Sequence, residues 1–199
     1  MIVLAISAEF GLAAIAGGAA VLIALLSFVV IYFNRLVRCN NLVNEAFSGI
    51  DVQLKRRHEL VPNLVECVKG YAAFERSLLE DVIAARSTAA SATDMVGLNA
   101  KENGLTANLA KLFAIAEAYP EVKANTVFLK LSGQLIEIED AIQYSRRYFN
   151  GAVRRLNITI ESFPSNLVAS WFQFTTKDYF EVDSVGERFT PTVTTRAPS

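Results

Sequence analysis

Residues 10–33 read FGLAAIAGGAAVLIALLSFVVIYF, which is 24 positions without a single Asp, Glu, Lys or Arg. A helix of that length is about 36 Å long, and the hydrocarbon core of a bilayer is about 30 Å thick. We therefore predict a transmembrane helix. It divides the chain into a short extracytoplasmic N-terminus (1–9), the span (10–33), a cytoplasmic helical bundle (34–183) and a disordered tail rich in Thr, Pro and Ser (184–199).

The charged residues indicate on which side of the membrane the two ends lie. Arg35 and Arg38 directly follow the span, whereas its other side carries Glu9 and no basic residue. The positive-inside rule then predicts a single-pass protein of the inner or cytoplasmic cell membrane, with its N-terminus outside and its C-terminal domain in the cytoplasm. A cleaved signal peptide is the alternative, although the chain lacks the basic region with which such peptides begin.

The chain beyond the span carries no net charge. It holds all 19 Lys and Arg residues and 19 of the 20 acidic residues, so its formal charge is 19 − 19 = 0. Binding to nucleic acid is therefore not expected, because the overall charge that would draw the chain to phosphates is missing.

The outer half of the span is rich in small residues spaced four apart, such as Ala13/Gly17 and Ala14/Gly18. Pairs of this kind let two helices approach closely in a membrane. A homo-oligomer formed through the transmembrane helix is one interpretation, and a plain anchor is the other.

Apolar residues beyond the span recur every three or four positions, which is typical of amphipathic helices. We expect the span to continue as a first bundle helix that ends in a turn at Glu59–Val61, because Pro62 removes a backbone hydrogen bond. Three more helices are expected at 62–91, 98–118 and 121–162. Tyr119 and Pro120 should end the second of these, since the residue before a proline avoids the helical region, and Pro164 should end the third. The predicted class is all-α: an antiparallel four-helix up-down bundle with a short C-terminal helix.

Three stretches resemble the LemA family. They are residues 50–71 (IDVQLKRRHELVPNLVECVKGY), 112–125 (LFAIAEAYPEVKAN) and 161–169 (ESFPSNLVA). The resemblance implies a bacterial protein with an N-terminal span, an extracellular N-terminus and an antiparallel four-helix bundle. The chain departs from the family pattern at Phe74, Leu156 and Gln173, where members tend to have His, Tyr and Gly. One member acts in organelle membrane formation in magnetic bacteria, which permits a membrane-organising role.

The sequence offers no pattern for catalysis or for a metal. His58 is the single histidine, whereas a carboxylate-bridged metal site in a bundle takes a histidine from each of two helices. Cys39 and Cys67 have no metal spacing, and a simple hairpin places them about 20 Å apart, too far for a disulfide. Cys39, just below the membrane, is either a packed thiol or an acylation site. We therefore expect no enzyme and no cofactor.

Two groups of residues are candidate interaction surfaces. Lys55, Arg56 and Arg57 form either a docking surface for an acidic protein partner or ion pairs within the bundle with Asp51, Glu59 or Glu66. Four apolar residues just before and after Pro164 form either a membrane-interface contact or a fifth helix that caps the bundle. These are Phe163, Leu167, Trp171 and Phe172.

The sequence therefore predicts a membrane-anchored bundle that works as a protein–protein interaction or scaffold module, with an unidentified protein and the lipid bilayer as partners. The alternative is a membrane-organising protein that acts through lipid contact or self-association.

Overall fold

A computed structural model describes residues 2–71, 74–91 and 95–180, with side chains from residue 17 onward except at 95 and 96. Within these residues every regular element is helical, which confirms the predicted all-α class. The helices are α1 (Ile2–Val68), α2 (Arg76–Ala90), α3 (Met95–Ala118), α4 (Pro120–Lys123), α5 (Thr126–Glu161) and α6 (Ser165–Trp171). The predicted tail at 184–199 lies outside the described residues. Ala13 and Ala14 lie within α1, but their side chains are not described.

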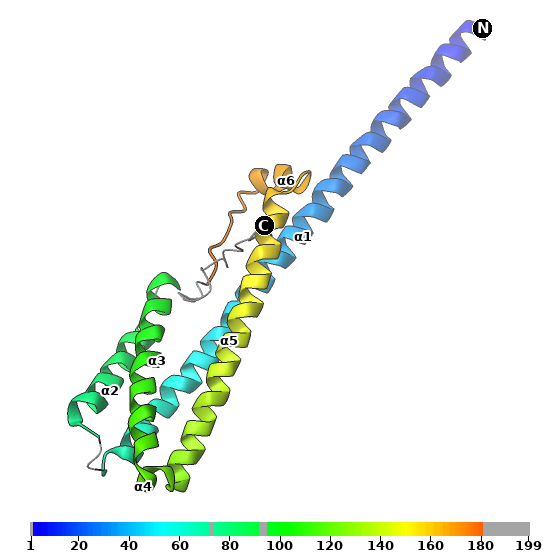
Figure 1. The fold of residues 1–199 in the computed structure, drawn as a ribbon. Helices are drawn as coiled ribbons and strands as arrows, with labels where there is room; N and C mark the ends of the chain where they lie inside the picture. The colour runs from blue at the N-terminus through cyan, green and yellow to red at the C-terminus, as the bar shows by residue number, and fades with distance from the viewer. Residues whose placement is uncertain (1, 72–73, 92–94, 181–199) are drawn as a thin grey trace, which may run out of the picture.

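The first half of α1 projects alone from the rest of the molecule (Figure 1). Among the described residues, α1 is the one helix long and apolar enough to cross a membrane, and only 6% of its most apolar window is buried. Most of its apolar side chains from Val21 to Ile31 are well exposed, and Phe28 and Val29 are half-buried. This part of α1 is a candidate membrane helix, which we call the span, and we refer to residues 34–180 as the helical body.

The predicted turn at Glu59–Val61 is wrong, because α1 continues through Pro62 to Val68. The proline leaves the backbone carbonyl of His58 without its helical donor, and Arg86 of α2 supplies one: its Nε donates to the His58 oxygen at 3.0 Å. The turns around the proline also bury Val61, Leu64 and Val68 completely. Tertiary contacts thus offset the local cost of Pro62, and the second bundle helix begins at Arg76 rather than at residue 62.

We expect this role of Arg86 to appear in a double-mutant cycle. Arg86→Met should lower the free energy of unfolding by about 1 kcal/mol, because the His58 carbonyl loses its partner. In a Pro62→Ala background the helix supplies its own donor, so the same change should cost less. Chemical unfolding of the full chain in detergent, followed by circular dichroism, measures both values. Arg76→Met, on the exposed side of α2, is the matched control. Equal costs of Arg86→Met in the two backgrounds would contradict the assignment.

The predicted helix at 121–162 is divided near its start. The expected break at Tyr119 and Pro120 is confirmed, since Tyr119 is extended and Pro120 begins α4. After one turn the chain restarts at Asn125, whose Oδ1 accepts hydrogen bonds from the backbone N–H groups of Val127 and Phe128 at 2.9 and 3.1 Å. An Asn that caps a helix in this way favours a new start over continuation.

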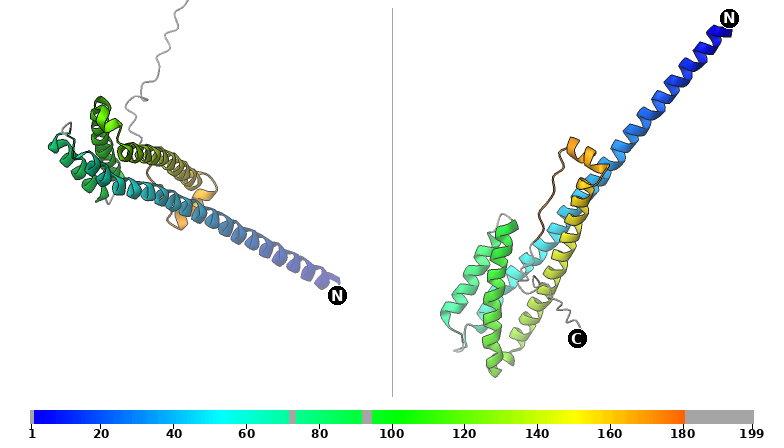
Figure 2. Two further views of the ribbon diagram at one scale, coloured as in Figure 1. Left: turned by 90° about the horizontal axis from the view of Figure 1, so that it is seen from below. Right: turned by 45° about the horizontal axis from the view of Figure 1, so that its top comes forward.

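Two long antiparallel helices, α1 and α5, run the length of the helical body. The shorter α2 and α3 pair with each other beside the half of α1 and α5 that lies farther from the span (Figures 1 and 2). The part of α1 beyond Phe33 has 35 residues, 34–68, and α5 has 36. Because both rise about 1.5 Å per residue, the end of α5 returns to the level of Phe33. The next helix, α6, lies there and contacts both α1 and α5.

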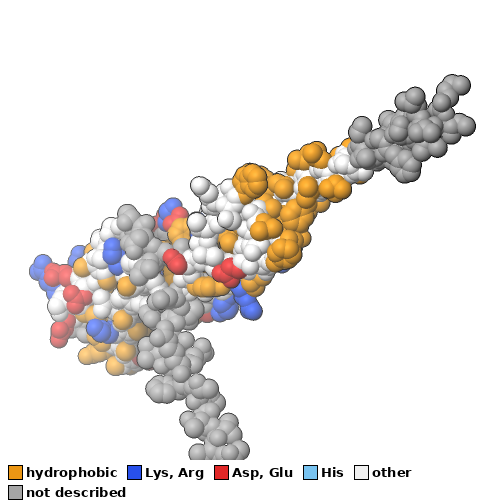
Figure 3. All heavy atoms as spheres, turned by 90° about the horizontal axis from the view of Figure 1, so that it is seen from above, with side chains coloured by type: hydrophobic (Ala, Val, Ile, Leu, Met, Phe, Trp, Pro, Cys, Tyr) orange, Lys and Arg blue, Asp and Glu red, His pale blue; other side chains and the backbone are white. Residues whose placement is uncertain are grey.

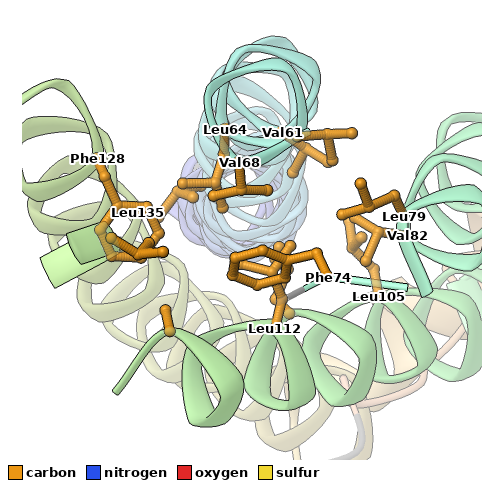
Figure 4. Packing of buried hydrophobic residues seen from close by; sticks show 14 residues of the cluster. Val61, Leu64, Val68, Phe74, Leu79, Val82, Leu105, Leu112, Phe128 and Leu135 are labelled. Atoms are coloured by element: carbon orange, nitrogen blue, oxygen red, sulfur yellow. The ribbon is translucent and has the colours of Figure 1, made fainter. Parts of the chain in front are cut away.

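The core has three parts along this length. In the part farthest from the span, apolar side chains from α1, α2, α3 and α5 converge around Phe74 (Figure 4). The middle part consists mainly of α1 and α5, with Phe149 packed edge-on against Phe47 and Phe180. The third part, around Leu36, Val168 and Ala169, lies beside the emerging span.

An extended segment, residues 174–180, returns along α5. Asn157 makes two hydrogen bonds of 2.9 Å to the backbone of Lys177, and Asn150 makes two of 2.8 and 3.0 Å to that of Phe180. Seven residues of helix span about 10.5 Å and three residues of extended chain span about 10 Å, so the two asparagines match the two sites. This pairing brings Phe180 into the middle core, where it is buried.

Candidate functional site

An open groove of about 870 Å³ lies between the end of α1 and α2, at the end of the helical body farthest from the span. Apolar side chains form its floor, and charged side chains line its edges. The floor includes Val65, Phe74, Leu79 and Ile83, and the edges carry Glu66, Lys69, Arg76 and Glu80.

Phe74 holds the two walls of the groove in place. It lies in the turn between α1 and α2, where its backbone N–H donates to the Tyr71 carbonyl at 3.2 Å, and its side chain is buried. Figure 4 shows it among Val68, Leu112 and Leu105. A bulky apolar residue at this position therefore joins the floor of the groove to the far core.

The charges at the edges form two pairs that are open to water. Lys69 Nζ lies 3.3 Å from Glu66 on α1, and Arg76 Nε lies 2.7 Å from Glu80 on α2. Exposed pairs of this type contribute at most about 1 kcal/mol each, so the side chains are free to exchange partners. An apolar floor flanked by charged side chains that can change partners is suited to binding one face of an amphipathic helix.

Of the three residues in the predicted basic surface, Lys55 and Arg56 are exposed and Arg57 is buried. Lys55 is exposed and pairs with Asp51 at 2.7 Å, as one of the two interpretations expected. Arg56 is exposed, and its Nη1 donates to Gln53 at 3.3 Å. Arg57, however, is 2% exposed and does not belong to any docking surface. For Lys55 and Arg56 the partner surface stays a prediction.

Arg57 instead is part of a buried charged cluster that joins α1, α3 and α5. Its Nη1 lies 3.1 Å from Glu139 and 3.5 Å from Glu102, and its Nη2 donates to Thr106 at 2.6 Å. Glu102 is fully buried and also meets His58 Nε2 at 2.7 Å. The ion-pair interpretation of Arg57 was therefore right in kind, but its partners are not Asp51, Glu59 or Glu66.

A second buried arginine, Arg146, lies on α5 about two helical turns beyond Glu139. Arg146 places its guanidinium carbon 4.6 Å from the centre of the Phe180 ring. Burial lowers the pKa of Arg146, and the charge of Glu139 opposes this effect. The group thus gains a cation–π contact in place of water.

The two cysteines are packing residues within the described fold. Cys39 is buried, with its Sγ 4.0 Å from Thr159 Oγ1, which matches the packed-thiol interpretation and leaves little access for acylation. Cys67 lies on the same helix 28 residues later, about 42 Å away, so the predicted separation of about 20 Å was too small. Both thiols are free, and burial raises the pKa of Cys67.

The four predicted membrane-interface residues are all exposed, and they lie in or beside α6. Phe163 is 79% exposed, Leu167 59%, Trp171 85% and Phe172 46%. Val168 and Ala169, on the opposite face of α6, are buried against Leu36 of α1. The structure thus provides a helix that packs on the body with one apolar face and presents another apolar face to the surroundings.

The sequence does contain a signal for the buried cluster. Glu102 falls on the apolar stripe of α3, three residues before Leu105, and Arg57 falls between Leu54 and Val61 on α1. A charge on the inward face of a helix indicates a buried partner. The groove had no comparable signal, because it depends on the position of the turn after α1.

A sequence model of the LemA family matches residues 46–194. Among curated proteins, the chain is similar to Magnetosome protein MamQ 1 of Paramagnetospirillum magneticum, at 26% identity over 86% of this chain and 72% of that protein. Magnetosome protein MamQ of Magnetospirillum gryphiswaldense is 24% identical over 87% and 72%. Protein LemA of Metamycoplasma hominis is 29% identical over 68% and 63%.

Proposed function

The chain belongs to the LemA family, and from this premise we propose that it is a membrane-anchored scaffold that binds a partner protein in the groove between α1 and α2. In this proposal the helical body works as a cytoplasmic four-helix up-down bundle. It acts on proteins and on the bilayer, by binding rather than by catalysis and without nucleic acid or a cofactor.

The groove itself carries the proposal. Its volume of about 870 Å³ is within the range of ligand sites, and its apolar floor with four charged edge residues suits an amphipathic helix. The 35 residues of α1 beyond Phe33 hold it about 50 Å from the end of the span. A partner bound there would be kept clear of the membrane surface.

A charge-swap experiment tests the groove. The pair Arg76→Glu with Glu80→Arg keeps the ion pair within α2 but reverses the charges that a partner meets. A photo-crosslinking residue at Ser87, which lines the groove, should capture a specific protein in cells, and the swap should strongly reduce the yield of that adduct.

The matched control is the swap Asp51→Lys with Lys55→Asp, at an exposed pair of the same spacing outside the groove. It should leave the adduct unchanged. If this control abolishes the adduct while the groove swap does not, the partner binds at Lys55 and Arg56 and the groove proposal is wrong.

The proposed orientation has a separate test. Arg35 and Arg38 follow the span, and Glu9 precedes it, so the helical body should lie in the cytoplasm. A reporter that is active only in the cytoplasm, fused after Ser199, should be active in intact cells. Cleavage of that C-terminus by a protease added outside the cells would contradict this orientation.

A second candidate function is organisation of the membrane itself, through lipid contact or through a homo-oligomer of the span. The exposed apolar face of α6 favours it, and so do the names of two of the relatives, which are magnetosome proteins. Purified protein would then assemble or reshape vesicles without any partner, whereas a scaffold would not.

A further inference from the structure

Helix α6 is apolar on both of its faces. Val168 and Ala169 pack against Leu36, while Leu167 and Trp171, four residues apart and therefore on one face, point away from the body. Phe163, just before the helix, extends this exposed set. Although Asn166 and Ser170 are polar, these exposed apolar side chains form one contiguous face. An exposed apolar face of this kind marks a contact with a second apolar environment.

The position of α6 identifies that environment. The rings of Phe172 and Phe174 lie 4.7 and 6.0 Å from the ring of Phe33, the last residue of the predicted span. Tyr32 and Phe28 pack into the same cluster. Figure 3 shows that hydrophobic side chains gather where the projecting part of α1 meets the body, whereas most charged side chains lie toward the other end.

The backbone conformation at the end of α6 fixes the position of this helix next to Phe33. Gln173, with φ of 58°, ends the helix in the left-handed region, and the N–H of Phe174 donates to the Ala169 carbonyl at 2.9 Å while that of Gln173 donates to Ser170 at 3.3 Å. This pattern is a Schellman motif, which usually has Gly at the position of Gln173. It turns Phe174 back onto Phe33 and leaves Trp171 directed outward.

The charges near α6 complement a bilayer. Residues 154–178 contain three basic residues, Arg154, Arg155 and Lys177, against the two acids Glu161 and Asp178. Arg35 and Arg38, which follow the span on α1, add two more basic residues. Basic residues close to a membrane surface are attracted to anionic lipids, at about 1 kcal/mol each. Aromatic side chains next to them are typical of the membrane–water interface.

We propose that the outer face of α6, formed by Phe163, Leu167 and Trp171, lies in the headgroup region of the bilayer that α1 spans. A helix with this arrangement would lie about 5–10 Å deep, at the boundary between headgroups and acyl chains. The chain would then contact the membrane at two points, along the span and at α6. The inference rests on α1 being a membrane anchor, as proposed above.

Trp171 is the only tryptophan of the chain, so its fluorescence tests the proposal directly. The full chain is reconstituted into vesicles of equal parts phosphatidylcholine and phosphatidylglycerol, with bromine atoms placed either near the headgroups or near the acyl-chain ends. We expect strong quenching by the headgroup-proximal bromines, weaker quenching by the terminal ones, and little quenching by acrylamide in the water. The double variant Phe163→Ser/Leu167→Ser, at two exposed positions, should partly restore acrylamide quenching.

The matched control moves the tryptophan along the helical body. Trp171→Phe with Tyr144→Trp places it at a position on α5 that is 66% exposed and about 25 Å from the end of that helix. This tryptophan should be open to acrylamide and unaffected by either lipid. If Trp171 in the wild-type chain behaves like this control, α6 does not contact the bilayer.

Two further results are informative. Emission shielded from both acrylamide and brominated lipid would show that protein, such as a second copy of the chain, covers α6, and it would overturn the proposal. Flotation of the vesicles reports anchoring independently of Trp171. Protein that fails to float with the vesicles would show that the anchor itself is wrong, whereas floating protein with an acrylamide-accessible Trp171 would refute only the placement of α6.

Discussion

Replacing Glu102 with alanine is expected to lower the free energy of unfolding by about 3–5 kcal/mol, because it leaves the buried charge of Arg57 without its buried partner. Glu102 is fully buried and contacts both Arg57 and His58, while the remaining partner, Glu139, has a side chain that is 35% exposed. Urea unfolding of the full chain in detergent, followed by circular dichroism, measures the change.

Two further variants test the physical cause of that loss. Glu117→Ala, at an exposed position of the same helix α3, should change the free energy of unfolding by no more than about 0.5 kcal/mol. The double variant Arg57→Met/Glu102→Leu should recover most of the loss, since it removes both charges and fills the space with apolar groups. If the double variant is as unstable as Glu102→Ala, the loss comes from packing rather than from an unpaired charge.

A loss of similar size, about 3–5 kcal/mol, is expected for Phe149→Ala. The ring of Phe149 is 1% exposed and lies 6.0 and 6.5 Å from those of Phe47 and Phe180. Its removal leaves a cavity between α1 and α5, at a level where α3 contributes only the partly buried Leu98 to the described core cluster. Few neighbours are therefore available to fill the space.

The adjacent residue provides the control for this measurement. Tyr148→Ala changes a side chain of similar size on the same turn of α5, but at an exposed position, so it should cost less than about 1 kcal/mol. Phe149→Ala should also loosen the segment 174–180, because Phe180 loses the ring against which it packs. Similar losses for the two variants would mean that the inward face of α5 is assigned wrongly.

The sequence predicted the helices well where their signals are local. The span follows from an uncharged run, the end of α3 from Tyr119 and Pro120, and the end of α5 from Pro164. The position of the first turn could not be predicted, because Pro62 is a valid local signal for a helix end. Its effect is cancelled by Arg86, 24 residues away, and by core residues from four other helices.

That one error also affected the candidate sites. With a turn at 59–61, Arg57 would lie near the end of a hairpin and could be exposed, and α5 would be about fifteen residues too long for its partner. With α1 continuing to Val68, Arg57 lies in the middle of the helical body, where α3 and α5 surround it. The groove between α1 and α2 exists only in this second arrangement, so no reading of local sequence pattern could have found it.

Because α1 is continuous, the direction of its first half determines where the far end of the molecule lies. In the proposed anchored arrangement, one continuous helix, Ile2–Val68, joins the bilayer to the groove. A change in the tilt of the span would then move the far end of the molecule by an amount that grows with distance. At about 50 Å, a tilt of about 10° displaces the groove by about 9 Å. Spans tilt in response to bilayer thickness. The thickness of the membrane would thereby be translated into the position at which a bound partner is held.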